Sequence, residues 1–120
     1  MDEAYGYKFL QEKLGCDVKE LALRLGKSEG YVFNRLKLNS LIKEAQKDID
    51  DGNLPLVYAL EISKYTPDIQ KLIYGEVYRK EGKYQGNNWV EEPVKGELVP
   101  LKSFLDWINT RIHRLLAKAP

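Results

Sequence analysis

The sequence predicts an all-α protein in which a helix-turn-helix is held within a compact bundle of about six or seven helices. Two observations lead to this fold class. Apolar residues recur at helical spacing along most of the 120 residues, and glycines, prolines and capping residues separate the periodic segments. Residues 18–36 have the pattern of a helix, a tight turn and a second helix, and no segment alternates convincingly as a strand would.

Three helices are expected in the first third of the chain. Gly15 stops the first of them, Asp17 can cap the second, and Gly26 can end it because glycine tolerates a positive φ. Ser28 can cap the third helix. The apolar residues expected to face inward on these helices are Tyr7, Leu10, Leu14, Val18, Leu21, Ala22, Leu25, Val32 and Leu36.

Three more helices should follow. The fourth stops at residues 51–53, and Pro55 suits the first turn of the fifth. The sixth starts with Thr66 as a capping hydroxyl, Pro67 with its φ already set, and Asp68 near the positive end of the helix dipole. The expected inner faces are Leu38, Ile42, Ala45 and Ile49, then Leu56, Ala59, Leu60 and Ser63, then Ile69, Leu72, Ile73 and Val77.

Residues 1–80 are therefore expected to form one helix-turn-helix domain, followed by a loop over residues 81–99 that is partly extended or disordered. The turn-favouring residues of this loop are Gly82, Gly86, Asn87, Asn88, Pro93 and Gly96. Residues 100–120 should form a last helix that packs on the domain or extends from it. Its apolar side is Leu101, Phe104, Leu105, Ile108, Ile112 and Leu115. Trp89 is expected to pack the loop onto this helix, whereas an exposed Trp89 would indicate a partner surface.

Composition excludes several classes of protein. With 43% hydrophobic residues the chain can fill a core, but no window reaches the roughly 18 apolar residues of a membrane span, and its start is no signal peptide. The single cysteine, Cys16, excludes an internal disulfide and a cysteine-based zinc site, and the single histidine, His113, argues against a Ser-His-Asp triad. We therefore expect a cytoplasmic protein that is not an enzyme, with no catalytic residue, cofactor, metal or membrane partner.

Charge is distributed unevenly, although the net charge is only +1. Residues 18–43 hold six basic and two acidic residues, whereas residues 44–51 hold four acidic and one basic residue. A basic surface beside an acidic one is expected where a protein binds phosphates on one face. Two solvated helix faces would give the same pattern, so charge alone leaves both interpretations open. The acidic cluster of Asp48, Asp50 and Asp51 is interpreted as a solvated helix end rather than a metal site.

The helix-turn-helix pattern supplies what DNA recognition needs. Ala22 lets the two helices cross closely, Gly26 makes the turn, and Val32 docks the second helix on the first. A recognition helix of about residues 28–37 can then enter the DNA major groove.

Seven residues are expected to face DNA: Lys27, Ser28, Glu29, Tyr31, Asn34, Arg35 and Lys37. Ser28, Tyr31 and Arg35 should share one outer line, with Glu29 and Asn34 beside it. Arg35 can donate two hydrogen bonds to guanine and Asn34 can pair with adenine, whereas the hydroxyl and ammonium groups suit phosphates. Glu29 either accepts a hydrogen bond from cytosine or stabilises the start of the helix, and the second role is favoured.

Two segments resemble the central domain of the ParB/RepB family of plasmid and chromosome partition proteins. They are residues 20–28 (ELALRLGKS) and 31–38 (YVFNRLKL), which match the family pattern E-L-A-x-R-L-G-K-S-x-x-Y-V-x-N-x-L-x-L. Residues 51–54 resemble the family's E-G-K-L, and Ala59 matches the alanine that follows it. Residues 101–120 resemble a segment that follows this domain in some relatives, so the likeness covers most of the chain.

The resemblance implies binding to a specific, often palindromic, double-stranded DNA site in plasmid or chromosome partition or in related regulation. We expect a homodimer that acts on paired half-sites and is associated with the bacterial nucleoid or a plasmid. The DNA-facing residues that it carries over are Lys27, Ser28, Tyr31, Asn34 and Arg35. Glu29 departs from the family, which often has a basic residue there. The upstream Gly-Glu-Arg-Arg domain of longer relatives is missing from this sequence, so we expect a fragment and assign no nucleotide hydrolysis to it.

One alternative stays open. An αα-corner in a helical bundle has the same small–glycine–aliphatic pattern without binding DNA. The chain would then be a helical protein–protein interaction module, and its basic stripe would be incidental.

Overall fold

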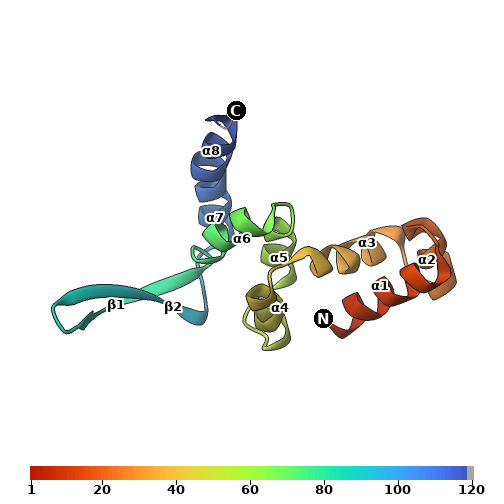
Figure 1. The fold of residues 1–120 in the computed structure, drawn as a ribbon, viewed down its shortest axis with the longest axis horizontal. Helices are drawn as coiled ribbons and strands as arrows, with labels where there is room; N and C mark the ends of the chain where they lie inside the picture. The colour runs from red at the N-terminus through yellow and green to blue at the C-terminus, as the bar shows by residue number, and fades with distance from the viewer. Residues whose placement is uncertain (119–120) are drawn as a thin grey trace.

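The structure is a computed structural model, and it describes residues 1–118. Figure 1 shows an elongated molecule with three helices at one end, a β-hairpin at the other and a C-terminal helix projecting between them. The elements in chain order are α1 (Asp2–Leu14), α2 (Val18–Leu25), α3 (Glu29–Lys37), a 3-10 turn η1 (Leu38–Ser40), α4 (Lys43–Asp50), α5 (Leu56–Ile62), α6 (Pro67–Tyr74), β1 (Tyr78–Gln85), β2 (Asn88–Leu98), α7 (Leu101–Trp107), a π-helical turn η2 (Ile108–Ile112) and α8 (His113–Lys118).

The prediction of a compact bundle is wrong. The radius of gyration is 17.1 Å and the principal extents are 58 × 36 × 23 Å. A compact domain of this length would have a radius of gyration of about 14 Å. The difference arises because the hairpin and the end of the C-terminal helix extend from the body instead of folding onto it.

The all-α prediction is wrong for residues 81–99, which form most of an antiparallel hairpin rather than a loop. Gln85 pairs with Asn88, so the turn consists of Gly86 and Asn87, and Gly86 has a φ of 63°. A positive φ at the first turn residue alone is the geometry of a type II′ hairpin turn. Every residue of β1 after its first is exposed, so no buried face imposes the alternation by which a strand is recognised.

Trp89 does not pack the hairpin onto the last helix. Its side chain is 57% exposed, meets the Tyr84 ring edge-on at a centroid distance of 5.0 Å, and lies across the backbone of Gly82. A Cβ atom at Gly82 would be 1.9 Å from the indole. The aromatic pair therefore stabilises the hairpin itself, because a cross-strand ring covers the glycine.

The base of the hairpin is fixed to the helices by Lys95. The register shifts between the Tyr78–Leu98 and Lys80–Pro93 pairs, which gives β2 a bulge that contains Lys95. The Lys95 ammonium lies 2.9 Å from Asp48 Oδ2 and also donates to the Tyr74 hydroxyl. Asp48 is buried in α4, so the interpretation of this carboxylate as a solvated helix end is wrong.

Two apolar cores hold the helices together. The N-terminal core lies between α1, α2 and α3, and its buried residues are Tyr7, Cys16, Leu21, Ala22 and Val32. The larger core joins α4 to α7 and η2, and its buried residues include Tyr58, Ile62, Ile73, Phe104, Ile108 and Ile112. Ala4 of α1 and Leu38 of η1 belong to the larger core, so the helix-turn-helix is packed on the rest of the body.

The inner faces of the helices were predicted only in part. Leu14 is 45% exposed, and Leu72 and Leu115 are both 56% exposed, although all three were expected to face inward. Tyr58 and Ile62 of α5, which were not predicted to face inward, are buried in the larger core. Thr66 stands at the start of α6 but makes no side-chain capping bond, so the predicted capping hydroxyl is wrong. Within the described residues, none of the helices has the length and apolar character to cross a membrane.

Candidate nucleic-acid interface

The helix-turn-helix is built by three local capping interactions that the sequence predicts. Asp17 Oδ1 accepts a hydrogen bond from the Glu20 amide at 2.9 Å and so starts α2. Gly26 ends α2 with a φ of 68°, and Ser28 Oγ then accepts from the Tyr31 amide at 3.1 Å at the start of α3. The turn between α2 and α3 is therefore short and fixed at both ends.

The packing of α3 on α2 follows the predicted pattern. Leu21 and Val32 are fully buried, and Ala22 is 2% exposed at the crossing. These side chains fix one face of α3 against the domain, and the start of the helix remains at the surface, whereas Tyr31, Asn34, Arg35 and Lys37 are half-buried. Lys27, Ser28 and Glu29 are all exposed at that start.

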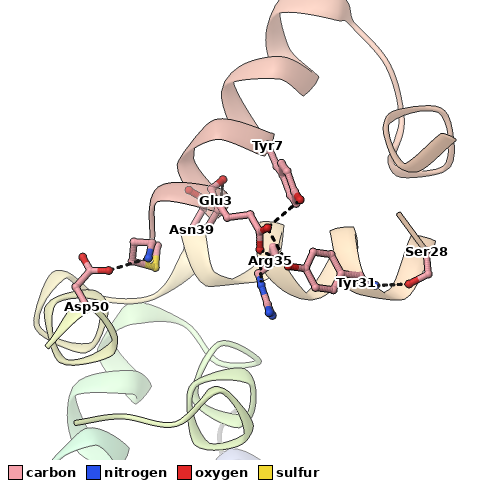
Figure 2. Close-up of polar contacts among 9 residues, drawn as sticks. Glu3, Tyr7, Ser28, Tyr31, Arg35, Asn39 and Asp50 are labelled. Carbon is pink, nitrogen blue, oxygen red and sulfur yellow. Dashed lines mark hydrogen bonds and ion pairs between the residues drawn. The ribbon is translucent and has the colours of Figure 1, made fainter. Parts of the chain in front are cut away.

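Two of the predicted DNA-facing residues are engaged by α1. The Tyr31 hydroxyl lies 2.7 and 2.8 Å from the two carboxylate oxygens of Glu3, and Arg35 Nε donates to Glu3 Oε1 at 2.8 Å. Tyr7 donates to the same carboxylate at 3.1 Å. Figure 2 shows this cluster between α1 and α3, with Ser28 apart from it at the start of α3. The predicted outer line of Ser28, Tyr31 and Arg35 is therefore divided, because the last two lie against α1.

The electrostatics of the cluster follow from these contacts. The pKa of Glu3 is lowered, chiefly by the hydrogen bond from Tyr31, with a further contribution from Arg35 that desolvation partly opposes. The pKa of Tyr31 is raised, first by the same bond to Glu3 and then by desolvation. The lowered pKa of Glu3 and the raised pKa values of Tyr7 and Tyr31 therefore favour an ionised carboxylate that accepts hydrogen bonds from neutral tyrosines.

The opposite side of α3 borders a shallow groove. Phe33, Asn34 and Lys37 line it from α3, facing Leu60, Ser63 and Lys64 at the end of α5, and its volume is about 210 Å³. Phe33 is 49% exposed, and the Lys37 ammonium lies 5.5 Å from the centroid of its ring. Lys64 is paired with Glu61 at 2.8 Å, so Lys37 is the cation of this groove without a salt bridge among the described residues.

Three residues around α3 were not predicted from the sequence. Glu3 contacts α3 from α1, and Phe33 and Lys64 line the groove on its other side. Glu3 and Tyr7 stand one helical turn apart, which is a local signal, but the contacts to Tyr31 and Arg35 span 28 and 32 residues and depend on tertiary packing. The described residues contain no grouping of three or more His, Cys, Asp and Glu side chains that could hold a metal ion.

Comparison with known proteins identifies the domain. The family model of the ParB HTH domain matches residues 1–84. Similar relatives include probable chromosome-partitioning proteins ParB from Rickettsia bellii (strain RML369-C) and Rickettsia prowazekii (strain Madrid E), each 39% identical over 59 residues, and from Rickettsia typhi (strain ATCC VR-144 / Wilmington), 37% identical over 59 residues. Each match covers 49% of this chain but only 21% of the relative. No solved structure matches the chain.

The matched residues include the whole helix-turn-helix, the three helices that follow it and most of β1. They make up more than half of the 120 residues, so this chain belongs to the ParB HTH domain family.

Proposed function

We propose that this chain binds a specific double-stranded DNA site by placing α3 in the major groove. The observation that carries the proposal is the presentation of α3: its capped start is exposed beside Lys27, while its inner face is fixed by Val32. The exposed amide groups of a helix start favour a phosphate, and the first residues of a recognition helix are those that reach base edges.

The proposed roles follow from where each side chain lies. Lys27 and Ser28 lie at the exposed start of α3 and Lys37 lies near its end, so we assign these three to phosphates. Asn34 is half-buried in the groove beside α3 and the Arg35 side chain stays 24% exposed, so we assign these two to base edges. We assign Tyr31 to the support of Arg35, over which its ring lies.

Glu29 is exposed in the first turn of α3. Its negative charge interacts favourably with the positive end of the helix dipole but repels a phosphate bound at the same place. We therefore propose that Glu29 stabilises the helix start and weakens backbone contact there, so that Glu29→Gln would raise affinity for all duplexes without changing the preferred site.

The wider role is proposed from the relatives, which carry the name chromosome-partitioning protein ParB. We propose that this domain acts in DNA partition or related regulation, in the cytoplasm, on the nucleoid or a plasmid, and together with further domains of a longer protein. Two copies would bind paired half-sites about one helical turn of DNA apart.

A groove beside the C-terminal helix supports the proposed homodimer. It has a volume of about 670 Å³, and its walls include Leu72 of α6, Trp107 of α7 and Leu115 of α8. Glu76 also lines the groove but is already paired with Lys80 at 2.9 Å, so the apolar side chains of the groove carry the proposed contact between copies. Leu115→Glu should lower the mass measured by sedimentation, whereas Leu23→Glu, at an exposed apolar position of α2, should not.

DNA selection tests the proposed function directly. A random duplex pool should yield one preferred motif, and the logarithm of the binding constant should fall steeply with the logarithm of salt concentration. A chain that binds no duplex at low salt would exclude DNA binding and leave the protein–protein interaction module as the function.

A further inference from the structure

Arg35 is held at one atom of its guanidinium. Its Nε donates to Glu3, and the guanidinium carbon lies 4.5 Å from the centroid of the Tyr31 ring. Among the described residues the two terminal nitrogens of Arg35 make no hydrogen bond, and Figure 2 shows the guanidinium directed away from the Glu3 carboxylate. The side chain is therefore oriented while the two nitrogens of its fork stay open.

Glu3 is itself fixed from two sides. Tyr7 donates to its Oε2 from the next turn of α1, and the Tyr31 hydroxyl contacts both carboxylate oxygens from α3. Lys27 lies 5.3 Å from the centroid of the Tyr31 ring and adds a second cation to the same aromatic surface. The carboxylate thus has hydrogen-bond partners on both helices, and its position relative to α3 is set by tertiary packing.

An acceptor fixed at Nε limits the orientations in which an arginine can bind the edge of a base. A guanine presents O6 and N7 side by side, and two parallel N–H groups of one guanidinium match them only in one plane. The Tyr31 ring beside the guanidinium carbon restricts how the guanidinium can turn, and the bond from Nε to Glu3 sets the direction of its fork. An arginine ordered before binding also loses less side-chain freedom when it binds.

A carboxylate near DNA can instead weaken binding, because it can keep the arginine away from the bases and repel the phosphates. The contact at Nε supports the positioning role of Glu3. A bidentate contact of Arg35 with a base would use its two terminal nitrogens and leave Nε bonded to Glu3. We infer that Glu3 is a positioning residue that aims the Arg35 fork at a base edge. This inference rests on the proposed DNA binding.

The test compares wild type, Glu3→Ala, Glu3→Gln, Arg35→Ala and the double variant on the selected site and on random duplex. Glu3→Ala should lower affinity for the selected site about 5- to 10-fold and relax the same base position as Arg35→Ala, with random-duplex affinity within about 2-fold of wild type. Glu3→Gln keeps an acceptor for Nε and should retain most of the specificity. The double variant should bind no more weakly than Arg35→Ala alone, because the two residues act as one unit.

Tyr7→Phe is the matched control, since it removes one bond to the same carboxylate without releasing Arg35. Circular dichroism melts of each variant separate loss of specificity from loss of fold. Tighter binding of Glu3→Ala to every duplex, or a motif identical to the wild-type motif, would overturn the inference while leaving the proposed function standing. A wild-type chain that binds no duplex would overturn both.

Discussion

The Lys95 ammonium in β2 lies 2.9 Å from the Asp48 carboxylate in α4, although 47 residues separate them in the sequence. The Asp48 side chain is 9% exposed and also accepts from the Tyr78 hydroxyl at 3.1 Å. Lys95 reaches it between the rings of Tyr74 and Tyr78, whose centroids are 4.4 and 5.0 Å from its nitrogen. The hairpin is therefore tied to the helical body by a charged group inserted among aromatic rings.

Removing Lys95 should loosen the hairpin base. In Lys95→Ala the Asp48 carboxylate keeps Tyr78 but loses its cation while remaining mostly buried, which should cost about 1–3 kcal/mol of unfolding free energy. Urea unfolding followed by circular dichroism measures this loss. Lys83→Ala is the control, because its pair with Glu92 at the exposed part of the hairpin should contribute at most about 0.5 kcal/mol. Equal losses in both variants would contradict the prediction.

The parts of the fold that the sequence predicts are those set by local chemistry. Asp17, Gly26 and Ser28 cap and end helices through bonds to residues at most four positions away, so their roles were visible in the sequence. The hairpin was missed because its strands have no buried face, and Asp48 was misjudged because its partners lie 30 and 47 residues away. The same limit hid Glu3, which acts on α3 only after α1 has packed against it.

Gln70 should be essential to the turn between α3 and α4. Its side chain is fully buried, accepts from the Ile42 amide at 2.8 Å and donates to the Ser40 and Tyr65 carbonyls at 2.9 and 2.8 Å. Gln70→Ala leaves these backbone groups without a side-chain partner and opens a cavity, so it should cost about 2–4 kcal/mol of unfolding free energy.

Lys71→Ala, at the next position of α6 and exposed, provides the comparison. It should change the unfolding free energy by no more than about 0.5 kcal/mol. If the two variants unfold at the same urea concentration, Gln70 does not hold the turn.

Ionisation of Glu3 should make part of the folding stability depend on pH in the acid range. The pKa of its carboxyl is lowered in the folded chain, chiefly by the bond from Tyr31, so the ionised form is favoured by folding. This stabilisation is fully present above the ordinary pKa of 4.5 and is lost as the pH falls through the lower folded value. The difference in melting temperature between wild type and Glu3→Gln should therefore be larger at pH 7 than at pH 3. A difference that does not change with pH would exclude this contribution.

Lys37 should contribute a phosphate contact rather than a base contact. It lines the groove beside α3, and its ammonium lies over Phe33 without a salt bridge among the described residues. If Lys37 neutralises one phosphate, Lys37→Ala should reduce the slope of log K against log salt by about 0.9 and weaken binding to all duplexes similarly. Lys71→Ala on α6, outside the helix-turn-helix, should leave the slope unchanged. A changed motif with an unchanged slope would instead place Lys37 at a base edge, because base contacts alter sequence preference whereas phosphate contacts release counterions.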